Sequence, residues 1–241
     1  MKMANDFEPL DGPDLAAAAY MLRPSEYTAA LIQTLFNMCA FVRGAQVVEI
    51  GSGSGVVLAA LAGMGAGALC GIDIEDEAVR VGEVLLQSVA AGAVVEFRRG
   101  DLWQPVAGRQ FDLVVANLPH FPTEAGDFPG RLGSWSQGGR DGRRLLDPFL
   151  DGLAQHLAPF GRAVITHNAF VDLAHTRRRL AQDGLSARIA RTVMLALPRE
   201  KLNRMTTEIR VREEGRSIHS LGPYSFGRMH ILEICGGGTR R

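Results

Sequence analysis

Short apolar stretches alternate along the chain with longer stretches in which apolar and polar residues recur with a helical period. The apolar stretches are rich in valine and isoleucine. Near-continuous apolar runs of this length are typical of strands that are buried on both faces of a parallel sheet. We therefore predict seven strands, at residues 46–50, 68–74, 94–98, 111–116, 162–166, 189–197 and 229–234.

Helical periodicity fills most of the intervals between these strands. Residues 76–91 place Val79, Leu86 and Val89 on one side of a helix, with charges elsewhere. Residues 25–41 follow Pro24, and proline is common in or just before the first turn of a helix. The alternation predicts an α/β fold: a doubly wound, mostly parallel, seven-stranded sheet with helices on both faces. Right-handed crossovers then place the loops that follow the strands at one edge of the sheet.

We predict one domain, over residues 21–235, between an N-terminal extension (1–20) and a flexible tail (236–241). Two regions interrupt the alternation inside the domain. Residues 117–142 are rich in glycine and proline, and long loops in compact domains are usually functional or disordered. Residues 198–226 are polar and charged, which fits a hairpin, a lid or a mobile insertion. We expect both regions to shape an acceptor pocket.

Composition excludes several classes of protein. The formal net charge is +0, so no global field attracts nucleic acid or a membrane surface. Cys39, Cys70 and Cys235 are scattered and have no histidine at ligand spacing, which argues against a disulfide framework and a zinc site. The sequence contains no apolar run of about 18 residues and no signal-peptide pattern at its start. We therefore expect a cytoplasmic protein without a metal.

A glycine-rich segment, GSGSG, follows the first strand and opens a helix over residues 54–63. Gly51, Gly53 and Gly55 allow positive φ and leave the backbone uncovered by any Cβ. The helix behind them offers free N–H groups and a partial positive charge to a ligand. Val56 stands where the dinucleotide-binding fingerprint GxGxxG requires glycine, so a pyrophosphate cradle is disfavoured.

Acidic residues stand at the ends of the first three strands. Glu49 lies inside the first strand, where a charge is costly without a partner. Asp73 ends the second strand about 20 residues past the loop, where an acid can accept both hydroxyls of a ribose. Asp101 follows the third strand and can accept from an exocyclic amino group, while Ile74 and Leu102 sandwich a purine ring. The three acids beside the glycine loop therefore predict an adenosine site.

This constellation resembles the class I S-adenosylmethionine-dependent methyltransferases, which have a Rossmann-like fold. The resemblance covers roughly residues 20–235 and implies S-adenosylmethionine as the cofactor, with its methionine part over the glycine loop. The residues that it implies for cofactor binding are Glu49, Gly51, Ser52, Gly53, Gly55, Asp73, Ile74, Asp101 and Leu102.

The fourth predicted strand ends in Asn-Leu-Pro-His, which resembles the (N/D)PP(Y/F/W) motif of amino-methyltransferases. Asn117 and Pro119 match the motif and are the candidate catalytic residues, with Asn117 also beside the cofactor. Leu118 and His120 depart from it and are candidate acceptor-binding residues. The Asn117 oxygen and the Leu118 carbonyl could hold the two N–H groups of a planar amide or amine. His120 either stacks on that planar group or is an ordinary loop histidine.

Two further segments resemble the HemK-like glutamine methyltransferases. Gly138–Gly142, with the sequence GGRDG, resembles the GGxDG segment of that family. Pro24–Thr28, with the sequence PSEYT, resembles the P-x-E-x-T segment of its short members. The family likeness implies that Thr28 approaches the cofactor. It also implies no N-terminal helical domain, because only about 45 residues precede the glycine loop.

The sequence thus predicts an S-adenosylmethionine-dependent N-methyltransferase that acts on a planar amide or amino nitrogen of a protein glutamine or a small molecule. One alternative is an amino-methyltransferase of RNA or DNA bases, against which the neutral charge weighs. The one compact basic run, residues 177–179, fits a solvated helix face better than a nucleic-acid site. The other alternative is a non-catalytic binding protein on the same fold. The oligomeric state is left open.

Overall fold

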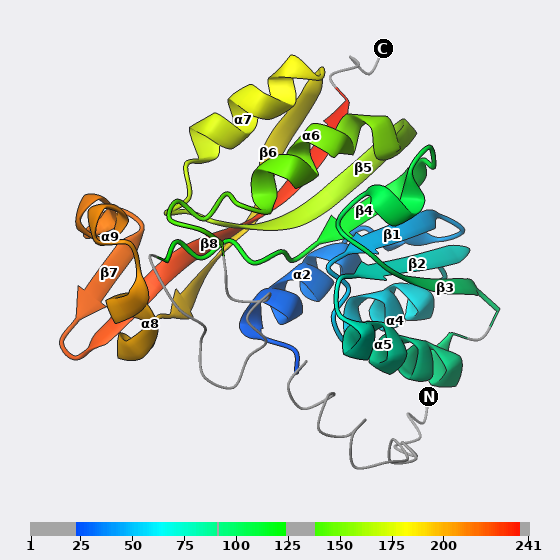
Figure 1. Cartoon of the computed structure of the whole chain (residues 1–241), viewed down its shortest axis with the longest axis horizontal. Helices are drawn as coiled ribbons and strands as arrows, with labels where there is room; N and C mark the ends of the chain where they lie inside the picture. The colour runs from blue at the N-terminus through cyan, green and yellow to red at the C-terminus, as the bar shows by residue number, and fades with distance from the viewer. Residues whose placement is uncertain (1–22, 91, 124–137, 237–241) are drawn as a thin grey trace.

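The computed structural model describes residues 23–90, 92–123 and 138–236. The predicted extension (1–20), most of the predicted tail and the middle of the loop after the fourth strand lie outside these residues. One mixed sheet contains every strand of the described part (Figure 1). The strands are β1 Gln46–Ile50, β2 Ala68–Asp73, β3 Val94–Arg99, β4 Phe111–Ala116, β5 Leu157–Asn168, β6 Leu185–Ala196, β7 Ile218–Leu221 and β8 Tyr224–Gly236.

The strand order is β3-β2-β1-β4-β5-β8-β6, and β7 pairs with β8 off this path. Strands β1 to β5 run parallel, whereas β8 is antiparallel to β5, β6 and β7. The doubly wound, mostly parallel sheet is therefore confirmed. The prediction of seven strands missed β7, and β8 extends to Gly236, which we had assigned to the tail.

Helices cover both faces of the sheet (Figure 1). The expected helix over 25–41 is divided in two, because α2 ends at Phe36 with Asn37 as its C-cap. The helix after the glycine loop begins at Val56 rather than at residue 54, because Gly55 is left-handed. The helices are α2 Glu26–Phe36, α3 Cys39–Val42, α4 Val56–Gly63, α5 Asp76–Val89, α6 Leu146–His156, α7 Leu173–Gln182, α8 Arg199–Arg204 and α9 Thr207–Glu213, with a short 3₁₀ helix, η1, at Gln104–Val106.

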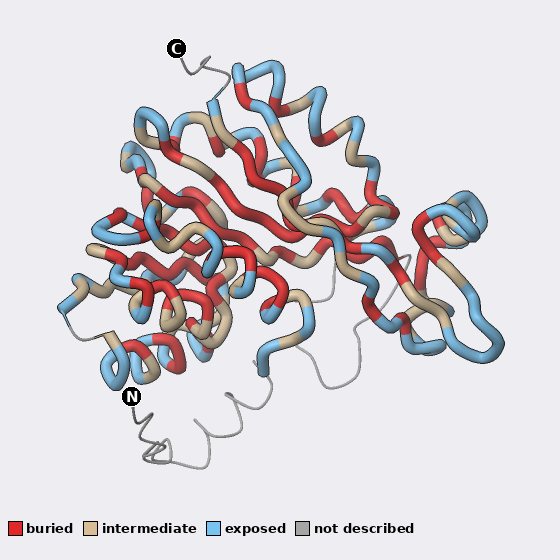
Figure 2. The backbone as a smooth tube through the Cα atoms, turned by 180° about the vertical axis from the view of Figure 1, so that it is seen from behind, coloured by how far each residue is buried: buried red, intermediate tan, exposed pale blue. Residues whose placement is uncertain are grey.

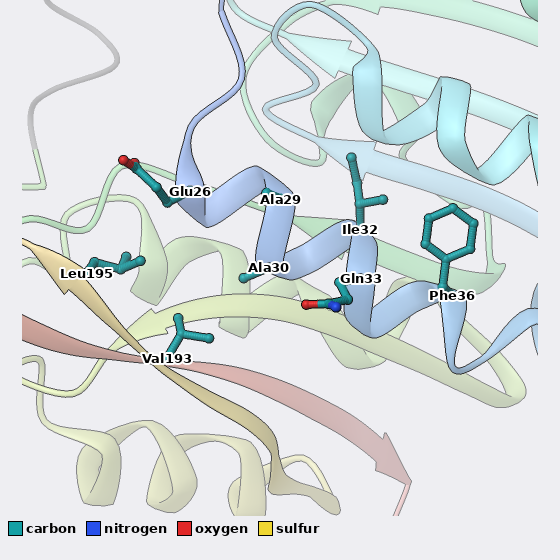
Figure 3. Close-up of a pocket in the computed structure, with 8 residues that line it drawn as sticks. All are labelled: Glu26, Ala29, Ala30, Ile32, Gln33, Phe36, Val193 and Leu195. Atoms are coloured by element: carbon teal, nitrogen blue, oxygen red, sulfur yellow. The ribbon is translucent and has the colours of Figure 1, made fainter.

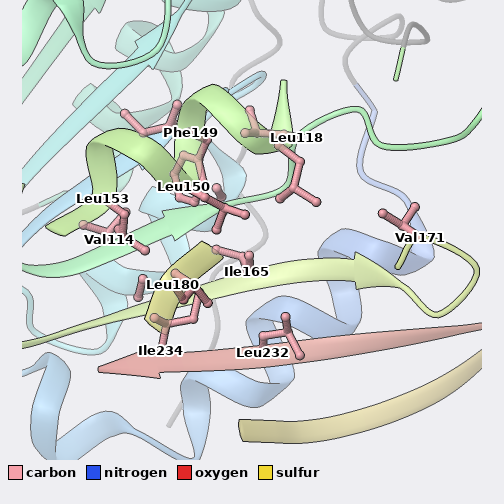
Figure 4. Packing of buried hydrophobic residues seen from close by; sticks show 14 of the residues in the cluster. Val114, Leu118, Phe149, Leu150, Leu153, Ile165, Val171, Leu180, Leu232 and Ile234 are labelled. Carbon is pink, nitrogen blue, oxygen red and sulfur yellow. The ribbon is translucent and has the colours of Figure 1, made fainter. Parts of the chain in front are cut away.

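Alternate residues of each central strand enter different cores. Val47 packs with α2 and α4, whereas its neighbour Val48 packs with α6 and α7 on the other face. Because side chains alternate across a strand, both positions must be apolar in a sheet covered on both sides. This requirement explains the near-continuous apolar runs. Figure 2 shows the buried central strands, and Figure 4 shows the cluster between α6, α7 and the sheet.

An open groove lies between α2 and the edge strand β6 (Figure 3). Its volume is about 620 Å³, and Ala29, Ile32, Phe36, Val193 and Leu195 are among its lining residues. None of the site residues predicted from the sequence lines it. The groove is therefore separate from the strand ends at which the predicted ligands would meet.

The buried face of α5 matches the expected one only in part. Leu86 is buried as expected, together with Ala78 and Gly82, whereas Val89 is exposed and Val79 is half-buried. A Cβ on Gly82 would overlap the ring of Phe97 in β3. Close approach of α5 to the sheet requires small residues at the contact, so the buried face is shifted from the two valines toward Ala78 and Gly82.

The segment between β6 and β8 forms α8, α9 and the β7–β8 hairpin. Of the three forms considered for residues 198–226, the hairpin is thus found, together with two short helices. Strand β7 pairs with Tyr224–Gly227 of β8, and β5 pairs with Met229–Cys235. The segment is therefore attached just past the carboxyl end of β5, at the sheet edge where the predicted site lies.

Candidate functional site

The glycine loop after β1 has the conformation that its residue types suggest. Gly51, Gly53 and Gly55 have φ of 72°, 52° and 75°, in the left-handed region that favours glycine. A Cβ on Gly51 would lie 3.0 Å from Cδ2 of Leu118, and one on Gly55 would lie 3.0 Å from Cα of Gly82. The glycines therefore let the loop pack closely against Leu118 and α5 at the carboxyl edge of the sheet, where Gly51 and Gly53 are half-buried.

Asp73 holds the glycine loop from the end of β2. Its Oδ2 accepts the backbone N–H of Gly53 at 2.8 Å, and its Oδ1 accepts the N–H of Glu75 at 3.1 Å. Burial raises the pKa of this carboxyl group above its ordinary value, against the opposing effect of these N–H donors. Asp73 thus fixes the loop geometry, and each carboxylate oxygen keeps a lone pair beyond its backbone partner.

Glu49 is a buried carboxyl group with an unused oxygen. The residue is 2% exposed, and its Oε2 has no hydrogen-bond partner among the described residues. Burial, and then the charge of Asp73, raise its pKa well above the ordinary value. The hydroxyl of Ser52 in the same loop is buried without a partner as well. Two buried acids beside open backbone suit a ligand that carries positive charge, as S-adenosylmethionine does on its sulfonium and ammonium groups.

The raised pKa of Glu49 predicts a measurable stability effect. The folded protein keeps this proton at pH values where the unfolded chain has released it, so stability is lost as pH rises from the unfolded value toward the folded one. Glu49→Gln does not titrate. We therefore expect its stability relative to wild type to rise with pH through this window, by up to about 1.4 kcal/mol per pH unit.

Denaturant unfolding of the cofactor-free protein between pH 4.5 and 8 measures this difference. Glu83→Gln, at an exposed position of α5, is the matched control and should follow wild type throughout. A constant difference between Glu49→Gln and wild type over the whole range would contradict the prediction.

The predicted adenine contacts gather after β2 and β3. Asp101 is exposed, Leu102 is half-buried with a left-handed φ of 47°, and the side chain of Ile74 is 48% exposed. A left-handed leucine is uncommon and is often found at functional sites. An exposed isoleucine and a strained leucine beside a solvated carboxylate match the composition expected of an adenine pocket.

The amide of Asn117 is held from both sides at the end of β4. Its Nδ2 donates to Oγ1 of Thr28 at 3.4 Å, and its Oδ1 accepts from Oγ1 of Thr166 at 2.8 Å. The structure thus brings Thr28 of α2 next to Asn117. Thr166 of β5 was missed by the sequence analysis.

Leu118 and His120 contact each other after β4. The side chain of Leu118 is buried in the core, and its carbonyl oxygen lies 2.6 Å from Nδ1 of His120. One lone pair of this carbonyl is therefore already used within the protein. His120 is 4% exposed and meets the ring of Tyr27 edge to face, with centroids 6.1 Å apart. The described arrangement favours the interpretation of His120 as a packed loop histidine over a stacking platform.

Neither buried histidine is a base at neutral pH. Burial lowers the pKa of His120 to about 4 and that of His167 to about 3. A carbonyl oxygen only accepts, so Nδ1 of His120 carries the proton in the contact with Leu118. His167 is held by the Asn168 carbonyl and by Thr176. Both rings are therefore neutral structural groups.

The GGRDG segment packs directly on the loop that follows β4. A Cβ on Gly138 would lie 2.5 Å from the carbonyl oxygen of Phe121, and one on Gly142 would lie 2.7 Å from that of His120. Thr123 donates its N–H to the Gly139 carbonyl at 2.9 Å. The glycines are thus explained by the close approach of two backbones, and the segment supports the Asn-Leu-Pro-His loop.

The α8–α9 segment contacts the same loop from the other side. Thr206, between the helices, donates its N–H to the Pro122 carbonyl at 3.2 Å and its hydroxyl to the Arg140 carbonyl at 2.6 Å. The ammonium group of Lys201 lies 4.6 Å from the ring centre of Phe121 and 5.5 Å from that of Tyr27. The segment is thus docked beside the end of β4.

The described residues bear on three other kinds of feature: a basic nucleic-acid site, a metal site and a membrane-spanning helix. In the basic run of α7, Arg178 pairs with Asp172, and Arg179 pairs with Asp147 and Asp151. The run is thus a solvated helix face with acidic partners. Across the described ranges, no cluster of three or more His, Cys, Asp or Glu residues could hold a metal ion. No helix there is long and apolar enough to cross a membrane.

Comparisons with known proteins agree with this geometry. A methyltransferase domain family model matches residues 47–128. The chain is 28% identical over 194 residues to a Methanocaldococcus jannaschii protein assigned as a protein N5-glutamine methyltransferase, covering 80% of this chain and 94% of that one. It is 36% identical over 152 residues to the human methyltransferase HEMK2, covering 57% of this chain and 67% of that one.

A solved Pyrococcus horikoshii structure, assigned as an RNA methyltransferase, has the same fold. Its TM-score is 0.60 at 15% identity, with 98% of this chain and 94% of that chain covered. The domain family model and the sequence relatives carry the reaction class, and this solved structure shares the fold. The chain belongs to the HemK-type family of class I S-adenosylmethionine-dependent methyltransferases.

Proposed function

We propose that this methyltransferase acts on the side-chain amide nitrogen of a glutamine in a protein. The observation that carries the proposal is the Asn117 amide, fixed between two threonine hydroxyls at the end of β4 and next to the glycine loop. The M. jannaschii relative is assigned as a protein N5-glutamine methyltransferase, which supports a protein acceptor.

The chain's residues fit the cofactor along the carboxyl edge of the sheet. In this proposal the backbone and Ser52 of the glycine loop hold the methionine part, close to Glu49. Asp73 accepts the ribose hydroxyls with the lone pairs left free by Gly53 and Glu75. Asp101 accepts from the adenine amino group, and Ile74 and Leu102 cover the two faces of the ring. The unpartnered oxygens of Glu49 and Ser52 are the observations that support this fit.

When bound, S-adenosylmethionine supplies an electrophilic methyl group with a sulfide as its leaving group. An amide nitrogen is a poor nucleophile, because its lone pair is delocalised into the carbonyl. In this proposal Asn117 Oδ1 accepts one N–H of the acceptor, and the remaining lone pair of the Leu118 carbonyl accepts the other. Pro119 limits the motion of this turn. Positioning of this kind supplies roughly 7–11 kcal/mol in well-oriented systems.

Proton removal does not need a side-chain base. The nitrogen–carbon bond forms as the carbon–sulfur bond breaks, and the methylated nitrogen then carries an excess proton that water removes readily. The low pKa of His120 and His167 agrees with this role for water, because each neutral ring is too weak a base to take up a second proton efficiently at pH 7.

Radiolabelled S-adenosylmethionine with an extract of the source cells, fractionated into protein, RNA and small molecules, tests the acceptor class. We expect label in the protein fraction, with one methyl group on a glutamine by peptide mass spectrometry. Label confined to RNA or to small molecules would overturn the protein acceptor. Label on another residue type would overturn glutamine.

A further inference from the structure

The loop after β4 is held by two matched pairs of polar side chains. Thr28 and Thr166 bind the side chain of Asn117. Asn168 donates to the carbonyl of His120 at 3.4 Å and accepts from the hydroxyl of Tyr27 at 2.7 Å. Thr28 of α2 and Thr166 of β5 therefore contact the first residue of the Asn-Leu-Pro-His segment, and Tyr27 of α2 and Asn168 of β5 contact its last residue.

Strand register explains why β5 supplies these groups. The parallel pairing of β4 with β5 runs to Ala116 opposite Ile165, so Asn117 and Thr166 are the next residues on each strand. Asn117 and Thr166 therefore lie side by side just past the last paired residues of β4 and β5. Thr166 and Asn168 share one face of β5, because side chains alternate along a strand. Both are buried, and they follow the apolar run of residues 163–165.

The hydrogen bonds around Asn117 fit the amide orientation in which its oxygen faces Thr166. Oγ1 of Thr28 receives the N–H of Ser25 at 3.3 Å and lies 3.4 Å from Oγ of Ser25, to which its own proton can be donated. Thr28 is then an acceptor toward Asn117 and requires the NH₂ group on its side. Thr166 completes the arrangement as a donor at 2.8 Å to Oδ1. An amide held by one acceptor and one donor has a single preferred orientation.

From this geometry we infer that Thr166 is a positioning residue for methyl transfer, which fixes the Asn117 amide so that the second lone pair of Oδ1 meets the acceptor N–H. The inference rests on the proposed function and deepens it. Thr166 is 3% exposed and has Asn117 as its hydrogen-bond partner. Without its hydroxyl, the amide can rotate and present its NH₂ group, which repels an acceptor N–H instead of binding it.

The test removes the hydroxyl while it keeps the shape. Thr166→Val is expected to lower kcat about 10-fold on the protein fraction that wild type labels, with apparent KM and the Kd for S-adenosylhomocysteine within about 2-fold. Thr166→Ser, which restores the hydroxyl, should recover most of the rate. Thr34→Val is the matched control, because Thr34 is also buried but donates to Ala30 within α2. It should keep the wild-type rate.

A double-mutant cycle distinguishes positioning from general packing. If Thr166 acts through Asn117, Thr166→Val should change the residual rate of Asn117→Ala by less than about 2-fold, since the group to be positioned is gone. An equal loss in both backgrounds, or no loss in wild type, would overturn the role of Thr166 alone. Full activity of Asn117→Ala would instead overturn the proposed function, and the positioning role with it.

Discussion

Replacement of Asn117 with alanine is expected to lower kcat for methyl transfer by roughly 10²–10³-fold, the loss typical when one oriented polar group of a reaction centre is removed. The reason is geometric, because Asn117 directly follows β4 and places its Oδ1 next to the glycine loop. The Kd for S-adenosylhomocysteine should change by no more than about 3-fold, since Asn117 contributes only at the edge of the cofactor site. Single-turnover labelling together with calorimetry measures both quantities.

The control for this variant is Asn37→Ala, at the exposed C-cap of α2, which should keep the wild-type rate. A full rate in Asn117→Ala would mean that the acceptor nitrogen is held by other groups. A loss of cofactor binding as large as the loss of rate would mean that Asn117 belongs to the cofactor site rather than to the acceptor site.

Asp73→Ala should weaken S-adenosylhomocysteine binding by roughly 10²-fold or more, because hydrogen bonds to a charged group contribute about 1.5–3 kcal/mol each. The change removes the carboxylate proposed to bind the ribose hydroxyls. It also releases the N–H of Gly53, so the glycine loop loses its tie to β2. Calorimetric titration with S-adenosylhomocysteine measures the effect, and circular dichroism checks that the fold is intact.

Asp76→Ala is the comparison for this second variant. Asp76 lies at the exposed start of α5 and pairs with Arg99 on the surface, so its loss should change the Kd by less than about 2-fold. Asp73→Asn should bind with intermediate strength, because one oxygen acceptor remains. Wild-type affinity in Asp73→Ala would place the ribose elsewhere.

The apolar runs of the sequence predicted the main sheet because both of its faces are covered by helices. Strand β4 was predicted with both of its ends correct. Its neighbouring residues Val114 and Val115 enter different cores, so the strand is mostly apolar and stands out in the sequence. Strand β7 was missed because its four residues form a strand only by pairing with the overlong β8. Such pairing depends on tertiary contacts rather than on local pattern.

Some residues of the candidate site could be recognised in the sequence, and others could not. Glu49 and Asp73 were recognisable because a charge at a strand end is unusual in itself. Thr166 was not, because its partner Asn117 lies 49 residues away and a single threonine in a strand is ordinary. The available indication was that the apolar run of β5 ends in three polar residues, Thr166, His167 and Asn168.

The proposed cofactor contacts and the α8–α9 segment come from separate parts of the chain. Every proposed cofactor contact except Thr28 and Asn117 lies between Glu49 and Leu102, whereas the α8–α9 segment enters only between β6 and β8. Because that segment is tied to the sheet through β8 and to the β4 loop through Thr206, its outer surface can diverge without disturbing the glycine loop. If this segment shapes the acceptor pocket, as we expect from the sequence, an exchange of residues 198–223 between relatives should change the acceptor while the affinity for the cofactor stays the same.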